Sequence, residues 1–264
     1  MVIKKYYYYF RLYFSNIFFY FTMKIGKVFS TLTLSKNYLG ILGKTLDDLY
    51  KNGYILIPNY YDKEEIVNLN NLLKRMLDDS IKEKTDGDFL ERIEGEIKMK
   101  HIQSRYPLLK RYSTEIFFTF LSFFFYGRPK LASVLCTITH DGTFSHPSVP
   151  GKCKNPIAYE PHVDTYHHYL KAMILLEDIK VENGPTVIMK GSSRNRKLFP
   201  NYVKLMHNEN NTVIEKKLFE EIQIENPPKC LVGKKGDLIL IDSRNVHWAS
   251  NIKKGCRKII WFYF

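Results

Sequence analysis

The stretch that decides the fold is residues 170–193, LKAMILLEDIKVENGPTVIMKGSS. It covers nearly all of one short apolar run, 169–177, and the whole of a second, 185–189, and turn-forming residues separate them. Apolar runs of this length that are bounded by turn residues are typical of buried strands. The same pattern of short apolar runs and turns extends from Leu131 to the C-terminus. The sequence therefore predicts a β sandwich or barrel in this half of the chain.

Further strands are expected on both sides of this pair, at 131–139, 157–164, 237–242, 246–250 and 257–264. Two segments interrupt them. Residues 141–156 carry three prolines and two glycines, which predicts a loop. Residues 195–229 form a second insertion, with a helix expected at 213–223. Both insertions flank expected strands.

The chain before Leu131 has a helical pattern instead. Residues 45–58 predict a short helix, a glycine turn and a strand. Asp62 and Glu65 then match a capping box, and apolar residues at helical spacing predict an amphipathic helix over 63–81. This helix is expected to pack against a sheet.

Two more segments complete this part of the chain. Residues 82–101 are highly charged and are expected to be exposed. Residues 113–126, STEIFFTFLSFFFY, are strongly aromatic. Their apolar stretch is too short to span a membrane, so it predicts a buried helix.

One constellation of residues carries chemistry. In an extended strand alternate side chains share a face, so His162 and Asp164 would project together. With His247 they form a set of two imidazoles and one carboxylate, which can occupy one face of an octahedral ferrous ion and leave three positions open. A 2-oxo acid and dioxygen could fill those positions. Arg257 would supply a charged fork for the distal carboxylate of 2-oxoglutarate.

The motifs around these residues resemble the phytanoyl-CoA dioxygenase family. They are His162-x-Asp164, Glu182-Asn183-Gly184-Pro185, Gly191-Ser192-Ser193, Gly236-Asp237, His247 and Arg257, with a weaker match at 53–69. The resemblance covers residues 45–264. Ser193 stands where the family often has His, and Ile259 stands where it has a Ser two residues after the Arg.

The resemblance implies a mainly β fold with packed helices, a cupin-like jelly roll also called a double-stranded β-helix. It implies the cofactor Fe(II), held by His162, Asp164 and His247, and the co-substrates 2-oxoglutarate and O2. The expected reaction is C–H hydroxylation with release of succinate and CO2. Asp164 favours hydroxylation over halogenation, because halogenases of this type leave that position to chloride.

Several other residues are weaker candidates. Thr139, Tyr159 and Thr137 could donate hydrogen bonds to the carboxylates of 2-oxoglutarate, and Lys258 or Lys171 could replace Arg257. Glu160 shares the expected face of His162 and could be an extra ligand. His167 and His168 could contact the substrate or pack in a loop.

Composition leaves the partners open. The formal net charge is +13 and is spread along the chain. It fits either a solvated lysine-rich surface or attraction for an anionic small-molecule substrate or membrane surface. Nucleic acid is not expected, because no binding motif accompanies the charge. The four cysteines show no Cys-x-x-Cys spacing, so neither a disulfide framework nor a zinc site is expected.

The first 23 residues, MVIKKYYYYFRLYFSNIFFYFTM, differ from the rest. Polar residues interrupt the apolar stretch, and no cleavage site for a secretory signal follows. The segment is either an interfacial anchor or a leader upstream of a start at Met23. The prediction is thus one domain over 24–264, helical over 24–130 and with the catalytic β core over 131–264.

The sequence leaves two interpretations of the whole chain. The first is an oxygenase in the cytoplasm, including the inner face of a membrane, that acts on a small, anionic, lipid-linked or sugar-linked substrate. The second is a catalytically silent binding protein that has kept the jelly roll.

Overall fold

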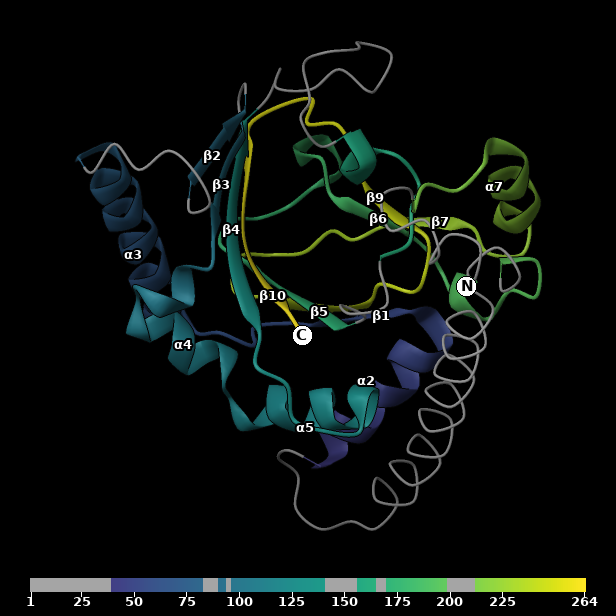
Figure 1. Ribbon diagram of the computed structural model, residues 1–264, viewed down its shortest axis with the longest axis horizontal. Helices are drawn as coiled ribbons and strands as arrows, with labels where there is room; N and C mark the ends of the chain where they lie inside the picture. Colours follow the sequence, from purple (N-terminus) through teal and green to yellow (C-terminus); the bar gives the residue numbers. More distant parts are fainter. Residues whose placement is uncertain (1–38, 83–89, 94–95, 141–155, 165–169, 199–211) are drawn as a thin grey trace, which may run out of the picture.

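The computed structural model describes residues 39–82, 90–93, 96–140, 156–164, 170–198 and 212–264 (Figure 1). Its α-helices are α2 Leu39–Asn52, α3 Lys63–Lys82, α4 Pro107–Ser113, α5 Ile116–Tyr126 and α7 Lys216–Gln223. Its strands are β1 Tyr54–Ile57, β2 Leu90–Ile93, β3 Glu96–Lys100, β4 Ser133–His140, β5 Leu170–Leu175, β6 Thr186–Met189, β7 Pro228–Cys230, β8 Leu238–Asp242, β9 His247–Ala249 and β10 Cys256–Tyr263.

Two antiparallel sheets form the β core. The larger has the strand order β1-β8-β5-β10-β4-β3-β2, and the smaller has the order β7-β6-β9. Neighbouring strands come from distant parts of the chain, which is the connectivity of a jelly roll. Figure 1 shows α2 to α5 along the outer face of the larger sheet and α7 beside the smaller one. The predicted fold class is confirmed.

Side-chain alternation divides the larger sheet into two faces. On β5, Ala172 and Ile174 belong to the core under the helices, whereas Met173 and Leu175 pack between the two sheets. The strand is buried on both faces, which explains why it reads as a continuous apolar run. The second residue of β5, Lys171, has the same parity as Met173 and therefore faces the interior.

The helices on the outer face are positioned by aromatic packing and by capping. Phe118 of α5 is fully buried and contacts Phe262 and Phe264 at the C-terminal end of the chain. At the start of α3, Asp62 accepts a hydrogen bond from the Glu65 backbone N–H at 2.8 Å, and the Glu65 carboxylate accepts one from the Asp62 N–H at 2.9 Å. The predicted capping box is confirmed.

Two expectations from the sequence are wrong. Residues 157–164 do not form a strand: a 3-10 helix covers Pro156–Tyr159, and His162 makes only isolated bridges. Prolines at 156 and 161 lack the N–H groups that a strand ladder needs. The charged segment 82–101 contains β2 and β3 and is not simply exposed, because Glu96, Lys98 and Met99 of β3 are buried. Together with β1, the strand expected after Gly53, these strands belong to the larger sheet.

The aromatic helix α5 is buried on one side only. Phe117, Phe118, Leu121 and Phe125 are in the core, whereas Ile116, Phe120 and Phe123 are exposed. Across the described residues, the structure contains no helix that is both long and apolar enough to cross a membrane. Cys136, Cys230 and Cys256 are free thiols.

Candidate metal centre

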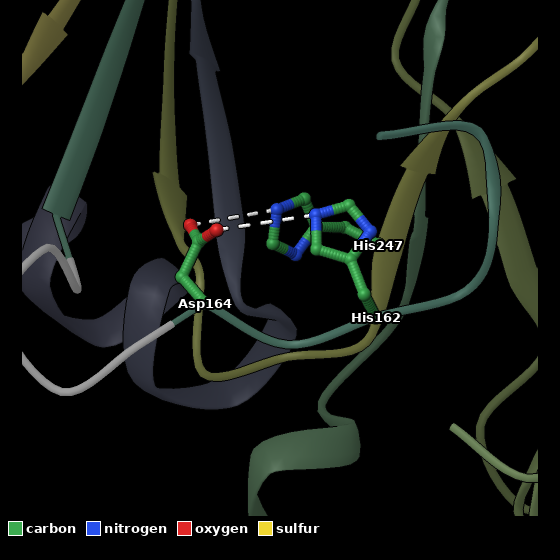
Figure 2. Close-up of side chains that lie close together, drawn as sticks. All are labelled: His162, Asp164 and His247. Carbon is green, nitrogen blue, oxygen red and sulfur yellow. Dashed lines mark ion pairs between the residues drawn. The ribbon is translucent and has the colours of Figure 1, made fainter. Parts of the chain in front are cut away.

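His162, Asp164 and His247 come together as the sequence predicts. One possible ligand atom from each lies within 4.8 Å of the others. The Asp164 carboxylate faces both rings, with Oδ1 3.9 Å from His162 Nε2 and Oδ2 3.6 Å from His247 Nε2 (Figure 2). The two imidazole rings are tilted, with centroids 4.4 Å apart. Within the described residues, no other group of His, Cys, Asp or Glu meets this criterion.

Backbone hydrogen bonds fix the three ligands relative to one another. The His162 N–H donates to the His247 carbonyl at 3.1 Å, and the His247 N–H donates back to the His162 carbonyl at 2.8 Å. The Asp164 N–H donates to the Ser243 carbonyl at 3.1 Å. His162 and Asp164 therefore share one site without belonging to a regular strand, because the turn that leads into β9 holds both of them.

Each imidazole is also oriented by its second nitrogen. Nδ1 of His162 lies 2.7 Å from the Glu160 carbonyl, and Nδ1 of His247 lies 2.9 Å from the Asn245 carbonyl. A carbonyl can only accept, so Nδ1 carries the proton in both rings and Nε2 carries the lone pair. Both Nε2 atoms face Asp164. This arrangement fits an Fe(II) site of the two-histidine, one-carboxylate type, with three positions left for other ligands.

Burial keeps the site ready for a metal ion at neutral pH. Desolvation lowers the pKa of His247 to about 3 and also lowers the pKa of His162. For Asp164, burial by itself would raise the pKa, but Lys171 and the two imidazoles together hold the pKa well below its ordinary range. At pH 7 the set is two neutral imidazoles and one carboxylate, and these are the protonation states that bind a metal.

A buried polar turn supports His247. Asp242, Ser243, Arg244 and Asn245 are all at most 6% exposed. Arg244 donates to both carboxylate oxygens of Asp242 at 2.8 Å. The Asn245 side chain donates to the Asp242 carbonyl at 2.9 Å and accepts from the Ser193 N–H at 3.0 Å. Ser193, which departs from the family pattern, thus contributes through its backbone.

Arg257 is buried at the start of β10, on the same strand face as Ile259 and Trp261. It donates to the Gly184 carbonyl and bonds to Tyr159. Burial lowers its pKa, while Tyr159 and Glu96 counteract that effect. Its Nε is buried and has no hydrogen-bond partner in the described part of the chain. A carboxylate could accept from this nitrogen as part of a charged fork.

The weaker candidates from the sequence, Thr139, Thr137 and Glu160, make other contacts near the site. Thr139 pairs with Arg257 across β4 and β10, and its hydroxyl donates to Glu96 at 3.3 Å. Thr137 accepts from the Trp261 indole, also at 3.3 Å. Glu160 is not part of the ligand group and contributes a backbone carbonyl to His162. His167 and His168 lie outside the described residues, as does most of the loop 141–156.

Two features of the site were missed by the sequence patterns. Lys171, considered there only as a substitute for Arg257, instead forms an ion pair with Asp164. Glu96 and Lys98 are buried side by side on β3, with 3.0 Å between Lys98 Nζ and Glu96 Oε2. Lys258, the other proposed substitute, pairs with Glu177 and has the strand parity of the face that packs on the helices. Lys171, Glu96 and Lys98 could have been found from their strand positions, which have the parity of the inward-facing residues.

The family model for phytanoyl-CoA dioxygenase (PhyH) matches residues 49–259 of this chain. That range includes the metal-ligand group, Tyr159, Thr139 and Arg257. No curated protein is similar in sequence at a significant level.

Three solved structures of low sequence identity share the fold. The α-ketoglutarate-dependent epimerase SnoN from nogalamycin biosynthesis has a TM-score of 0.59 at 16% identity, covering 85% of this chain and 82% of its own. EctD from S. alaskensis with bound Fe has a TM-score of 0.59 at 16% identity, with coverages of 82% and 74%. HygX from Streptomyces hygroscopicus, with nickel, 2-oxoglutarate and hygromycin B bound, has a TM-score of 0.54 at 14% identity, with coverages of 87% and 86%.

Proposed function

The chain belongs to the phytanoyl-CoA dioxygenase family of iron(II)- and 2-oxoglutarate-dependent oxygenases, and from that premise we propose that it hydroxylates a C–H bond of a small substrate. In the balanced reaction, substrate, O2 and 2-oxoglutarate give hydroxylated substrate, succinate and CO2. One oxygen atom enters the new hydroxyl group and the other enters succinate.

The observation that carries this proposal is the donor set. His162, Asp164 and His247 present three ligand atoms within 4.8 Å, and both rings have their lone pair on the nitrogen that faces the carboxylate. A set of three protein ligands leaves room for a bidentate oxo acid and dioxygen. A structural zinc site would instead be closed by four protein ligands.

The protein's own residues would divide the work. His162, Asp164 and His247 would hold the iron, which when bound supplies the activation of dioxygen and of 2-oxoglutarate. Arg257 would bind the distal carboxylate of 2-oxoglutarate, because its buried guanidinium has an Nε without a partner in the described residues. Tyr159 would hold the guanidinium in place through its hydrogen bond. Thr139 would need to release Glu96 to reach the same carboxylate.

A catalytically silent binding protein with the same fold is the alternative. Loss of catalysis removes the requirement for an intact ligand set with oriented rings, and this chain has both. The two functions differ in one measurable product, because only the enzyme converts 2-oxoglutarate.

The experiment is an assay of 2-oxoglutarate turnover. Purified protein with Fe(II), ascorbate and carboxyl-labelled 2-oxoglutarate should release labelled CO2 slowly without substrate and faster with one. Succinate formation then serves to screen candidate substrates. Asp164→Ala should abolish both signals while the protein stays folded. An iron-loaded wild-type protein that never releases CO2 would support the silent binding protein, and full activity of Asp164→Ala would refute the hydroxylase.

We further propose that residues 1–23 are an interfacial anchor that brings the enzyme to an anionic membrane surface. The support is compositional, since Tyr, Phe and basic residues occur together in one short segment. These residues lie outside the described part of the structure. An enzyme placed there would reach lipid-linked or sugar-linked substrates at the inner face of a membrane.

A further inference from the structure

Lys171 is a buried cation at the metal centre. Binding of iron and 2-oxoglutarate does not require it. It is the second residue of β5 and is 7% exposed. Its Nζ pairs with Asp164 Oδ2 and lies 3.5 Å from His247 Nε2. The same ammonium lies 4.9 Å from the centre of the Tyr263 ring. Lys171 is therefore held against the ligand group from inside the jelly roll.

Lys171 and Arg257 lie at opposite ends of the same interior. The sheet register places Lys171 beside Tyr263 and Arg257 beside Thr139. Tyr263 and Arg257 are six positions apart on β10, so their Cα atoms are roughly 20 Å apart along the strand, while both side chains face the interior. The Lys171 ammonium contacts the ligand atoms of Asp164 and His247, whereas Arg257 contacts Gly184 and Tyr159. We therefore assign the two cations different anionic groups.

The charged groups at the centre carry an excess of positive charge. Among the described residues, the charged side chains that face this interior are three cations and two anions. The cations are Lys98, Lys171 and Arg257, and the anions are Glu96 and Asp164. Lys98 is already compensated by Glu96 at 3.0 Å. In the metal-free protein Asp164 compensates Lys171. Arg257 is then the cation without a full counter-charge of its own.

Binding of Fe(II) and 2-oxoglutarate would change which cation lacks a counter-charge. Fe(II) brings two positive charges and 2-oxoglutarate brings two negative charges, so together they add no net charge. The distal carboxylate would compensate Arg257, while Asp164 and the other carboxylate would compensate the iron. Lys171 would then keep a positive charge with no anion of its own among the described residues. A buried charge without a partner is costly in free energy, so binding of an anion beside Lys171 would be favourable.

On the basis of the proposed oxygenase function, we propose that Lys171 is the anchor for a carboxylate or phosphate group of the substrate. The substrate is accordingly an anion that is bound inside the jelly roll, next to His162, Asp164 and His247. Tyr263 and Trp261 line the same interior face, with ring centres 6.0 Å apart, and provide an apolar surface for the rest of the molecule. A bound anion would pair with the Lys171 ammonium, because Asp164 would be bound to the iron.

Basic residues beside the second insertion are the other candidates for attracting an anion. The Arg194 guanidinium donates to the Lys51 carbonyl at 2.8 Å and lies over the Tyr50 ring. Lys197 lies 3.6 Å from Glu221. The anion recognition that we propose is therefore internal, and its effect should survive changes in these surface residues.

The test uses full-length protein loaded anaerobically with Fe(II) and 2-oxoglutarate, and the probes are acetate and inorganic phosphate at constant ionic strength. The readout is the shift of the visible charge-transfer band as each probe is added. The variants are Lys171→Met, which keeps the length without the charge, and Lys171→Arg, which keeps the charge. Lys258→Met is the matched control, because that lysine is paired with Glu177 away from the interior.

We expect wild type, Lys171→Arg and Lys258→Met to give a saturable shift with at least one probe. Lys171→Met should need about tenfold more of that probe or more, as expected for loss of a charge-assisted contact. Its iron affinity should be unchanged or higher, because a positive charge beside the metal has been removed. The acetate and phosphate titrations show which anion the site prefers.

Three results would overturn the inference. The first is a wild-type band that neither probe shifts, and the second is an equal response in wild type and Lys171→Met. The third is a Lys171→Met variant that binds iron more weakly or needs more 2-oxoglutarate but binds the probe normally, because Lys171 would then only position Asp164 or the co-substrate. If no band forms in wild type when 2-oxoglutarate is added, the oxygenase function itself fails, which is a separate outcome.

Discussion

At the scale of single residues, the metal ligands were predictable and their electrostatic neighbours were not. The residue types of His162, Asp164 and His247 and their spacing identify the donor set without any structure. Lys171 and Glu96 could not be assigned, because each needs the register of a strand to show which face it occupies. A charged residue in a sequence is ordinarily read as exposed, yet Glu96 is buried because Lys98 compensates it on the same face of β3.

Arg257→Ala should reduce the affinity for 2-oxoglutarate while iron binding is largely retained. A shielded charge-assisted pair contributes up to a few kcal/mol, so we expect the concentration of 2-oxoglutarate required to rise about tenfold to a hundredfold. Titration of the iron-loaded protein with 2-oxoglutarate measures this concentration directly.

Lys258→Ala is the neighbouring control for this prediction. Lys258 pairs with Glu177 on the other face of β10, so its loss should leave the 2-oxoglutarate requirement unchanged. If instead Arg257→Ala binds 2-oxoglutarate normally, another group holds the distal carboxylate.

The stability of the metal-free protein should fall as the pH is lowered from 6.5 toward 4. The pKa of His247 is about 3 in the folded protein and about 6.5 in an unfolded chain. In this window the unfolded state binds more protons, so acid favours unfolding, by up to about 1.4 kcal/mol per pH unit for one proton. His162 acts in the same direction, because burial lowers its pKa too.

Urea unfolding at a series of pH values measures this slope, and His247→Gln should reduce it. A slope that is the same in wild type and His247→Gln would show that His247 is not buried in its neutral form.

At the scale of elements, regular patterns were read correctly and irregular connections were not. The apolar runs that became β4, β5, β6, β8, β9 and β10 were identified from their length and their turn residues. The segment before His162 was wrongly expected to be a strand, because two prolines and the long-range bridges to Val213 and His247 determine its path. Strands β2 and β3 were missed, because β2 pairs only with β3, and β3 joins the sheet through β4, which is more than 30 residues away.

Gly53→Ala should destabilise the protein more than Gly255→Ala. Both glycines have positive φ values, +79° and +81°, so each substitution carries a left-handed backbone cost. A Cβ at Gly53 would also lie 2.4 Å from the Asn245 side chain, whereas at Gly255 the nearest atom is 3.1 Å away. Overpacking should add about 1–3 kcal/mol at Gly53.

Urea unfolding of the two variants compares these costs. Gly53→Ala should also weaken iron binding, because Asn245 supplies the carbonyl that orients His247. Equal losses of stability in the two variants would mean that the turn around Asn245 shifts at little cost.

At the scale of the whole molecule, the jelly roll followed from the succession of strands, while the substrate did not follow from the sequence. The order of the seven-stranded sheet brings residues from β3, β4, β5 and β10 to one interior, and this juxtaposition alone reveals the excess of positive charge. The division into a leader, 1–23, and one domain, 24–264, stays a prediction.

Removal of residues 1–23 should leave folding and uncoupled 2-oxoglutarate turnover intact but release the protein from anionic vesicles. Cosedimentation with vesicles of anionic lipid, compared with neutral vesicles, measures the binding. If the truncated protein still binds, the exposed side of α5, with Ile116, Phe120 and Phe123, is the next surface to change. A truncated protein that cannot fold would show that the segment packs into the core.

The most direct test of the metal centre is an anaerobic titration of the protein first with Fe(II) and then with 2-oxoglutarate, followed by visible absorption. We expect one iron per chain and a weak charge-transfer band that appears only when 2-oxoglutarate is added. His162→Ala, Asp164→Ala and His247→Ala should each lack the band while remaining folded. A wild-type protein that binds no iron, or a band that persists in Asp164→Ala, would contradict the assignment of the metal centre.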